Sequence, residues 1–128
     1  MLPHESRYNI HLCRYPKLET LNAYCRLLLG ERDCSMFAAA GDSSKSFHRF
    51  ISGAAFFIDG GRLIFEISAN AFLRKMARSV AGTFLHYEET ATPPEQLRDI
   101  ISLNDRSLVG PTLPPQGLFL WKVDFSRE

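Results

Sequence analysis

One arginine in this sequence stands where an arginine can hold a carboxylate. Arg78 lies two residues after Met76, at the border of a strongly apolar helical pattern. A guanidinium at such a border can project into a cleft and bind a carboxylate through two parallel hydrogen bonds. It can also extend into solvent while its methylene groups cover apolar surface. Both interpretations of Arg78 are open from the residues alone.

Two further features of the sequence could contribute to a functional site. Gly82 stands inside the same helical pattern, where glycine costs about 1 kcal/mol relative to alanine, so we expect another group to approach the helix closely there. Residues 103–118 form a loop rich in glycine and proline before a predicted core strand, which is typical of functional loops. Asp105 and Arg106 in this loop either take part in function or fix the shape of the loop.

Common catalytic motifs do not occur in the sequence. There is no Walker loop, no GxGxxG, no HExxH and no GxSxG. The four histidines are too scattered for a metal cluster, and His86 is interpreted as a surface histidine rather than a base. The three cysteines, at positions 13, 25 and 34, contain no CxxC pair. They are interpreted as small buried hydrophobic side chains rather than reactive thiols.

Hydrophobic periodicity predicts the elements that position these residues. Gly30 stands where the first helix would end, and residues 59–61 supply a hairpin turn. The order of elements predicts an α+β fold in one domain, residues 1–128, with an antiparallel sheet backed by helices. In chain order, we expect a short strand near 8–12, a helix at 18–29, strands at 47–58 and 62–69, helices at 71–87 and from 93, and a strand at 118–125.

Composition indicates a globular protein. Hydrophobic residues make up 45% and charged residues 23% of 128 residues. No run approaches 18 apolar residues and the first residues do not resemble a secretion signal, so we expect no membrane partner and a cytoplasmic location. The net charge of +1 predicts no nucleic-acid partner by itself. Residues 44–86 carry six basic against two acidic side chains, which fits either local phosphate contact or a solvated face.

Three segments together resemble the TruA family of tRNA pseudouridine synthases, over about residues 17 to 125. In that family a strand ends in Asn-Ala-Phe before a helix with Met-x-Arg-x-x-x-Gly, which stands here as Asn70-Ala71-Phe72, Met76, Arg78 and Gly82. The later family pattern of Asp-Arg-Ser and Pro-Pro-x-Gly-Leu stands here as Asp105-Arg106-Ser107 and residues 114–118. A weaker match is residues 28–37, which are similar to Leu-x-Gly-x-His-Asp-Phe-x-x-Phe.

This resemblance implies conversion of uridine to pseudouridine in the anticodon arm of tRNA, without a metal or organic cofactor. Arg78 matches the family's arginine that pairs with the catalytic aspartate, and such a role requires its guanidinium to face a groove. The family's nucleophile belongs to a Gly-Arg-Thr-Asp-Ala-Gly-type motif in the N-terminal half, and that motif does not occur in these 128 residues. We therefore expect a C-terminal half that is inactive alone. Its expected partners are tRNA, the N-terminal half and a second copy.

Six residues are predicted to bind RNA or substrate by the same resemblance: Asn70, Phe72, Arg74, Lys75, Asp105 and Arg106. The sequence departs from the family pattern where Arg74 and Lys75 replace a His/aromatic pair and where Cys34 replaces a phenylalanine. Acidic residues 88–89 also stand where glycines are usual. An alternative hypothesis is a non-catalytic RNA-binding or dimerisation module left from such an enzyme.

Overall fold

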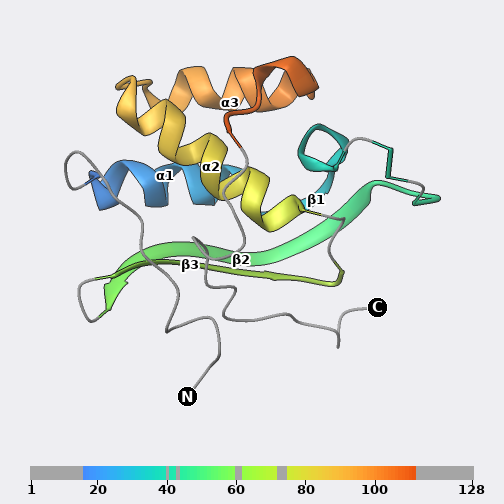
Figure 1. The fold of residues 1–128 in the computed structure, drawn as a ribbon, viewed down its shortest axis with the longest axis horizontal. Coiled ribbons are helices and arrows are strands. Elements are labelled where there is room, and N and C mark those ends of the chain that lie inside the picture. The colour runs from blue at the N-terminus through green and yellow to red at the C-terminus, as the bar shows by residue number, and fades with distance from the viewer. Residues whose placement is uncertain (1–15, 40, 43, 60–61, 72–74, 112–128) are drawn as a thin grey trace.

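The computed structural model describes residues 16–39, 41–42, 44–59, 62–71 and 75–111 (Figure 1). Three strands form one antiparallel sheet in the order β1-β2-β3, and three helices lie on the same face of it. This arrangement confirms the predicted α+β fold. The elements are α1 (Leu18–Leu28), β1 (Gly30–Asp33), the 3-10 helix η2 (Ser35–Phe37), β2 (His48–Asp59), β3 (Arg62–Ala69), α2 (Met76–Glu89), α3 (Pro94–Leu103) and the 3-10 helix η3 (Arg106–Leu108).

The sheet is built on the long strand β2. Its first part pairs with β1, from Gly30 opposite Ile51 to Asp33 opposite His48. Its remaining length pairs with β3, and a bulge interrupts that register between Ile51 and Gly53. The predicted strands at 47–58 and 62–69 are therefore confirmed to within one residue. The turn at 60–61 and the strands expected at 8–12 and 118–125 lie outside the described residues.

Strand β1 was not predicted, for a physical reason. Three of its four residues are charged, and Glu31 and Asp33 are exposed, so it lacks the apolar alternation that identifies a half-buried strand. It forms because Gly30 takes a left-handed conformation (φ 100°) directly after α1 and turns the chain onto β2. The helix end predicted at Gly30 is thus confirmed.

The helix expected at 71–87 begins later than predicted, at Met76. Pairing with β2 continues past β3, because Asn70 donates its backbone N–H to the Phe50 carbonyl (3.1 Å) and its side-chain oxygen accepts from the Phe50 N–H (3.0 Å). Lys75 then takes a left-handed conformation (φ 60°) that cannot belong to the helix. The apolar periodicity matches the buried face of α2 at Met76, Val80 and Phe84, but it contains no signal for the turn before the helix.

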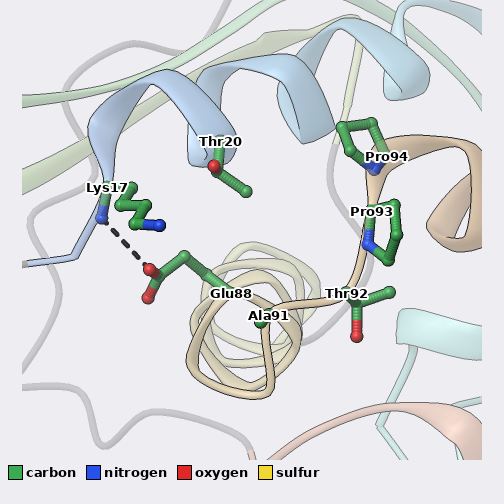
Figure 2. A pocket seen from close by; sticks show the side chains of 7 residues that line it. All are labelled: Lys17, Thr20, Glu88, Ala91, Thr92, Pro93 and Pro94. Carbon is green, nitrogen blue, oxygen red and sulfur yellow. Dashed lines mark hydrogen bonds between the residues drawn. The ribbon is translucent and has the colours of Figure 1, made fainter.

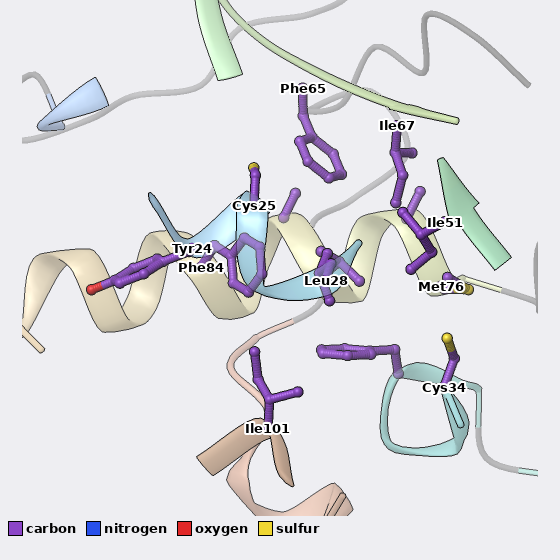
Figure 3. Packing of buried hydrophobic residues seen from close by; sticks show 14 of the residues in the cluster. Tyr24, Cys25, Leu28, Cys34, Ile51, Phe65, Ile67, Met76, Phe84 and Ile101 are labelled. Atoms are coloured by element: carbon purple, nitrogen blue, oxygen red, sulfur yellow. The ribbon is translucent and has the colours of Figure 1, made fainter. Parts of the chain in front are cut away.

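A hydrophobic core fills the space between the sheet and the helices. Side chains from α1, β2, β3, α2 and α3 converge there, as Figure 3 shows. Tyr24 and Phe84 meet edge to face with ring centroids 5.5 Å apart. No helix in the described part of the chain is long and apolar enough to cross a membrane. The largest fully buried side chains are Tyr24, Phe37, Phe65, Phe84, Leu21, Leu28, Met36, Ile51, Ile67, Met76, Leu97 and Val80.

Candidate active site

Arg78 lies in the first turn of α2 and is half-buried. Its neighbours on the helix, Met76, Ala77 and Ser79, are all buried, so α2 itself is anchored in the core at this point. Among the residues that the structure describes, none pairs with the Arg78 guanidinium. The side chain is thus neither sealed in the core nor fully surrounded by solvent.

The electrostatics of this helix start favour an anion. The N-terminal residues of a helix present unpaired N–H groups and about half a positive charge from the aligned peptide dipoles. An acidic residue in the first turn would normally offset that charge, but the first turn of α2 contains none, and the N-cap residue Lys75 makes no side-chain capping bond. The Arg78 guanidinium adds positive charge to the same end. The combination suits a carboxylate or phosphate group supplied from elsewhere.

The other predicted binding residues before α2 differ in their surroundings. Asn70 is half-buried, and its side-chain oxygen is engaged with the Phe50 N–H. Lys75 is exposed beside the start of the helix. Phe72 and Arg74 lie outside the described residues. Asn70 and Lys75 thus lie in the connection between β3 and α2, and Arg78 follows in the first turn of α2.

Asp105 and Arg106 stand at the start of η3, and both are exposed. The Asp105 carboxylate accepts hydrogen bonds from the Ser107 N–H (2.9 Å) and the Ser107 hydroxyl (2.8 Å). These bonds, above all the backbone one, lower the pKa of Asp105. Asp105 thus fixes the shape of this loop, one of the two roles considered for it. The 3-10 helix η2 contacts both η3 and α2.

Segment 105–110 is hydrogen-bonded to α2. The Tyr87 hydroxyl donates to the Leu108 carbonyl (2.5 Å), and the Gly110 N–H donates to the Thr83 hydroxyl (2.9 Å). A Cβ atom on Gly110 would lie 2.9 Å from the Thr83 Cα and 3.0 Å from the Gly82 carbonyl oxygen. The close approach at this turn of α2 depends on the missing side chain of Gly110, and whether Gly82 itself admits a neighbour stays a prediction. The approach of Gly110 occurs one helical turn beyond Arg78.

A pocket of about 540 Å³ lies at the opposite end of α2 (Figure 2). The buried Glu88 carboxylate points into it and accepts a hydrogen bond from the Lys17 N–H (3.1 Å), which caps α1. Nearby, the Tyr24 hydroxyl donates to the Thr92 carbonyl (2.5 Å). Burial, and then the Glu88 charge, raise the pKa of Tyr24 to about 12. None of the predicted site residues lines this pocket: its walls are Lys17, Thr20, Glu88, Ala91, Thr92, Pro93 and Pro94.

Cys25 and Cys34 are free and buried, as predicted for small hydrophobic side chains. Burial raises the pKa of Cys25 to about 12 and that of Cys34 to about 11, so both thiols stay protonated at neutral pH. Cys13 lies outside the described residues. Within the described ranges, no three His, Cys, Asp or Glu side chains converge as metal ligands would.

Sequence reasoning did not single out Asn104, which the structure places between three elements. It ends α3 in a left-handed conformation (φ 50°), and its side chain bonds to two residues of η2. A signal was present, because asparagine is the residue other than glycine that most readily takes this conformation after a helix. Its long-range bonds, to residues 68 and 69 positions away, left no trace in the local pattern.

Comparison with known proteins matches the same region of the chain. A family model described as tRNA pseudouridine synthase matches residues 24–126. The chain is 48% identical over 125 residues to "tRNA pseudouridine synthase A" of Treponema denticola, which covers 98% of this chain and 47% of the relative. Proteins of the same name from Treponema pallidum and Syntrophomonas wolfei are 45% identical over 108 residues and 37% identical over 112 residues. They cover 84% and 88% of this chain, and 39% and 45% of their own lengths.

The chain thus spans about half the length of the relatives that it matches. Its match to the family model covers most of its own residues, and it includes both the start of α2 and the segment around η3. These matches and the α+β arrangement agree with the resemblance drawn from residues 70–82 and 105–118. The chain belongs to the TruA family of tRNA pseudouridine synthases.

Proposed function

We propose that this chain is the C-terminal half of a tRNA pseudouridine synthase, in which Arg78 holds a nucleophilic aspartate supplied by an N-terminal half. The observation that carries the proposal is a half-buried arginine at a positively polarised helix start, in the position of the family's aspartate-binding arginine. No carboxylate in the described part of the chain pairs with it. The family's Gly-Arg-Thr-Asp-type motif does not occur in the 128 residues.

The chemistry explains why an arginine belongs there. A carboxylate must be ionised to attack uridine, yet a pocket that excludes water raises its pKa. A neighbouring arginine lowers an aspartate pKa by about 1–3 units, and the positive end of α2 acts in the same direction. Arg78 would therefore keep the nucleophile charged, and its two parallel donors would hold the carboxylate in one orientation.

The substrate proposed is a uridine in the anticodon arm of tRNA. The target base must leave its stack, at a cost of a few kcal/mol that protein contacts must offset. Lys75 and Arg106 are exposed cations available for phosphate contact. For Asn70, Phe72, Arg74 and Asp105 we propose contact with the RNA or the substrate, without assigning it to a phosphate. The enzyme is proposed to work as a cytoplasmic homodimer without a metal or organic cofactor.

Reconstitution tests the proposal directly. The purified chain is mixed with the N-terminal half of the Treponema denticola relative, a protein of which this chain covers 47% at 48% identity. Pseudouridine in unmodified tRNA transcripts is then measured by nuclease digestion and chromatography, which separates it from uridine. We expect product from the mixture and none from either half alone. Turnover by the 128-residue chain alone would contradict the proposed division of the active site.

A non-catalytic RNA-binding module also fits a chain in which Arg78 has no carboxylate partner among the described residues. Binding of tRNA is measured between 50 and 200 mM salt. This measurement separates the second function from a catalytic one only when it is combined with the reconstitution experiment. Either function predicts affinity that falls with salt, since each neutralised phosphate releases counterions. Salt-dependent binding without product in the reconstituted mixture would favour the module. Binding that does not change with salt would count against any nucleic-acid role.

A further inference from the structure

Asn104 joins the end of α3 to a distant part of the chain. Its side-chain oxygen accepts from the Met36 N–H (3.1 Å), and its side-chain nitrogen donates to the Ser35 hydroxyl (2.9 Å). Its own N–H donates to the Ile101 carbonyl, which closes α3 (3.0 Å). The left-handed backbone at Asn104 thus carries an amide whose donor and acceptor are both used on η2.

These bonds complete the N-terminal capping of η2. The first N–H groups of a short helix have no partner within it. The Ser35 N–H is satisfied by the Asp33 carboxylate (2.9 Å) and the Phe37 N–H by the Cys34 carbonyl (2.9 Å). The Met36 N–H between them is the one that Asn104 satisfies. Cys34, the N-cap residue, contributes no side-chain capping bond.

The 3-10 helix η2 in turn packs against the start of α2. Met36 and Phe37 are buried at 2% and 1% exposure, and the first residue of α2, Met76, is fully buried in the same core cluster. Figure 3 places Met76 and Cys34 on the same side of the core, and η2 contacts α2 directly. Arg78 follows Met76 by two residues in that first turn.

Asn104 also fixes η2 relative to α2 by a second route. Segment 105–110, which begins at the next residue, is bonded to α2 through Tyr87 and Thr83. The amide of Asn104 therefore ties η2 to a segment that is itself tied to α2. Loss of the amide would release η2 from this connection and leave side-chain packing to hold η2 against α2.

We propose that Asn104 is a positioning residue for Arg78: its amide holds η2 against the first turn of α2 and so determines where the guanidinium is presented. This inference rests on the proposed function for its catalytic consequence, but not for its structural one. Misplacement of a reacting group by about 1 Å can lower a rate by roughly 100-fold. Asn104 touches no reacting atom in this account.

The test uses Asn104→Gly, which keeps a residue suited to the left-handed conformation but removes the amide, and Ser35→Ala, which removes one of its two bonds. Ser102→Ala is the matched control, because it removes an exposed hydroxyl on α3 that bonds only to the Arg98 carbonyl among described residues. Two-dimensional ¹⁵N–¹H spectra of the 128-residue chain report on residues 76–79 and 86–89. We expect the Asn104→Gly change to shift the first group and leave the second in place, with a smaller shift for Ser35→Ala.

In the reconstituted enzyme, the turnover number kcat of Asn104→Gly should fall by roughly 10- to 100-fold, while KM for tRNA stays within about twofold. Ser102→Ala should keep both constants. Unchanged resonances of residues 76–79, despite shifted Ser35 and Met36, would overturn the inference. Should Asn104→Gly fail to fold, Ser35→Ala decides by the same spectra. Absence of activity in the unmutated mixture would sink the proposed function alone, since the spectra still decide the positioning role.

Discussion

The two ends of α2 are built in opposite ways. At its C-terminal end, the Thr90, Ala91 and Thr92 N–H groups return to carbonyls of the last turn, and the buried Glu88 carboxylate caps α1. At its N-terminal end, Lys75 stands in a left-handed conformation without a capping bond, and the first turn has a cation instead of an acid. One end is closed by the chain itself, and the other presents donors and positive charge.

This difference has an energetic meaning. A missing side-chain cap costs about 1 kcal/mol, a left-handed residue other than glycine about 1–2 kcal/mol, and a cation at a helix N-terminus about 0.3–1 kcal/mol. Unfavourable local arrangements of this kind persist where the surroundings hold them in place, and they gather at functional sites. The N-terminal end of α2 is thus where an external carboxylate or phosphate would recover stability that the isolated chain lacks.

Replacement of Arg78 by glutamine should have the largest effect, and this effect should be confined to the N-terminal end of α2. In the reconstituted enzyme we expect at least a roughly 100-fold loss of turnover, because removal of one partner from a buried ion pair costs about 3–5 kcal/mol. The isolated chain should keep or slightly gain stability, by about 0.3–1 kcal/mol, since a cation leaves the positive end of the helix. Rates of pseudouridine formation and urea unfolding measure the two effects.

Arg98→Gln is the control for Arg78→Gln, since Arg98 is an exposed arginine on α3. It should leave both the turnover and the unfolding midpoint unchanged. A reconstituted Arg78→Gln enzyme with full turnover, together with a chain destabilised by more than about 1 kcal/mol, would show that Arg78 serves the fold and not the site.

The contact that ties segment 105–110 to α2 is tested by Gly110→Ala. A new Cβ would lie 2.9 Å from both the Thr83 Cα and the His86 Cβ, so backbone must shift. Overpacking of this kind costs about 1–3 kcal/mol, which thermal or urea unfolding would detect. Gly53→Ala is the matched control, because no atom of the described residues lies within 4 Å of a Cβ there, and we expect it to be neutral or mildly stabilising. Equal effects of the two changes would contradict the close approach at α2.

Much of the fold followed from the sequence, because it rests on periodicity. The alternation of Leu63, Phe65 and Ile67 identified β3, and the apolar stripe identified α2. The start of α2 was misjudged because a left-handed lysine has no composition signal. Strand β1 was missed because its pairing with β2, rather than its own residues, makes it a strand.

The candidate site was predictable only in part. Arg78, Asp105 and Arg106 were chosen from the sequence, and the structure shows their positions and surroundings without testing their roles. The polar bonds of Asn104 depend on residues 68 and 69 positions earlier in the chain, and no local pattern encodes such a distance. Local propensity therefore predicted the elements, whereas the connections between them required the structure.

The closed end of α2 is tested by Tyr24→Phe. The change removes the hydrogen bond to the Thr92 carbonyl but keeps the ring against Phe84. We expect a loss of about 0.5–1.5 kcal/mol in the free energy of unfolding, with turnover of the reconstituted enzyme unchanged. Ser102→Ala, which removes an exposed hydrogen bond within α3, should cost less than about 0.5 kcal/mol. A turnover loss as large as that of Arg78→Gln would mean that the two ends of α2 do not act separately.

The same tyrosine gives this end a pH dependence. The folded chain raises the Tyr24 pKa to about 12, above an unfolded value of about 10. The folded state therefore holds the proton more tightly, and this contribution to stability is present below about pH 10 and is lost as pH rises toward 12. Unfolding midpoints at pH 8 and 11 should converge between the wild-type chain and Tyr24→Phe as the pH rises.

The smallest effect is expected beside the open end, at Asp33. Hydrogen bonds, first of all from the Ser35 N–H, lower the pKa of this carboxylate, which is exposed. Because its pKa is lowered, the Asp33 carboxylate stabilises the folded state at pH values above the unfolded pKa of about 3.9. This contribution is lost as the pH falls through the folded pKa.

Asp33→Asn keeps an acceptor for Ser35 but removes the charge. The stability difference between the wild-type chain and Asp33→Asn should therefore shrink as unfolding is measured at successively lower pH from 6 to 3, while the difference produced by the control Asp99→Asn on α3 stays smaller. A difference for Asp33→Asn that is constant across this range would mean that the carboxylate charge does not support η2, and that Asn104 and packing alone hold it beside Arg78.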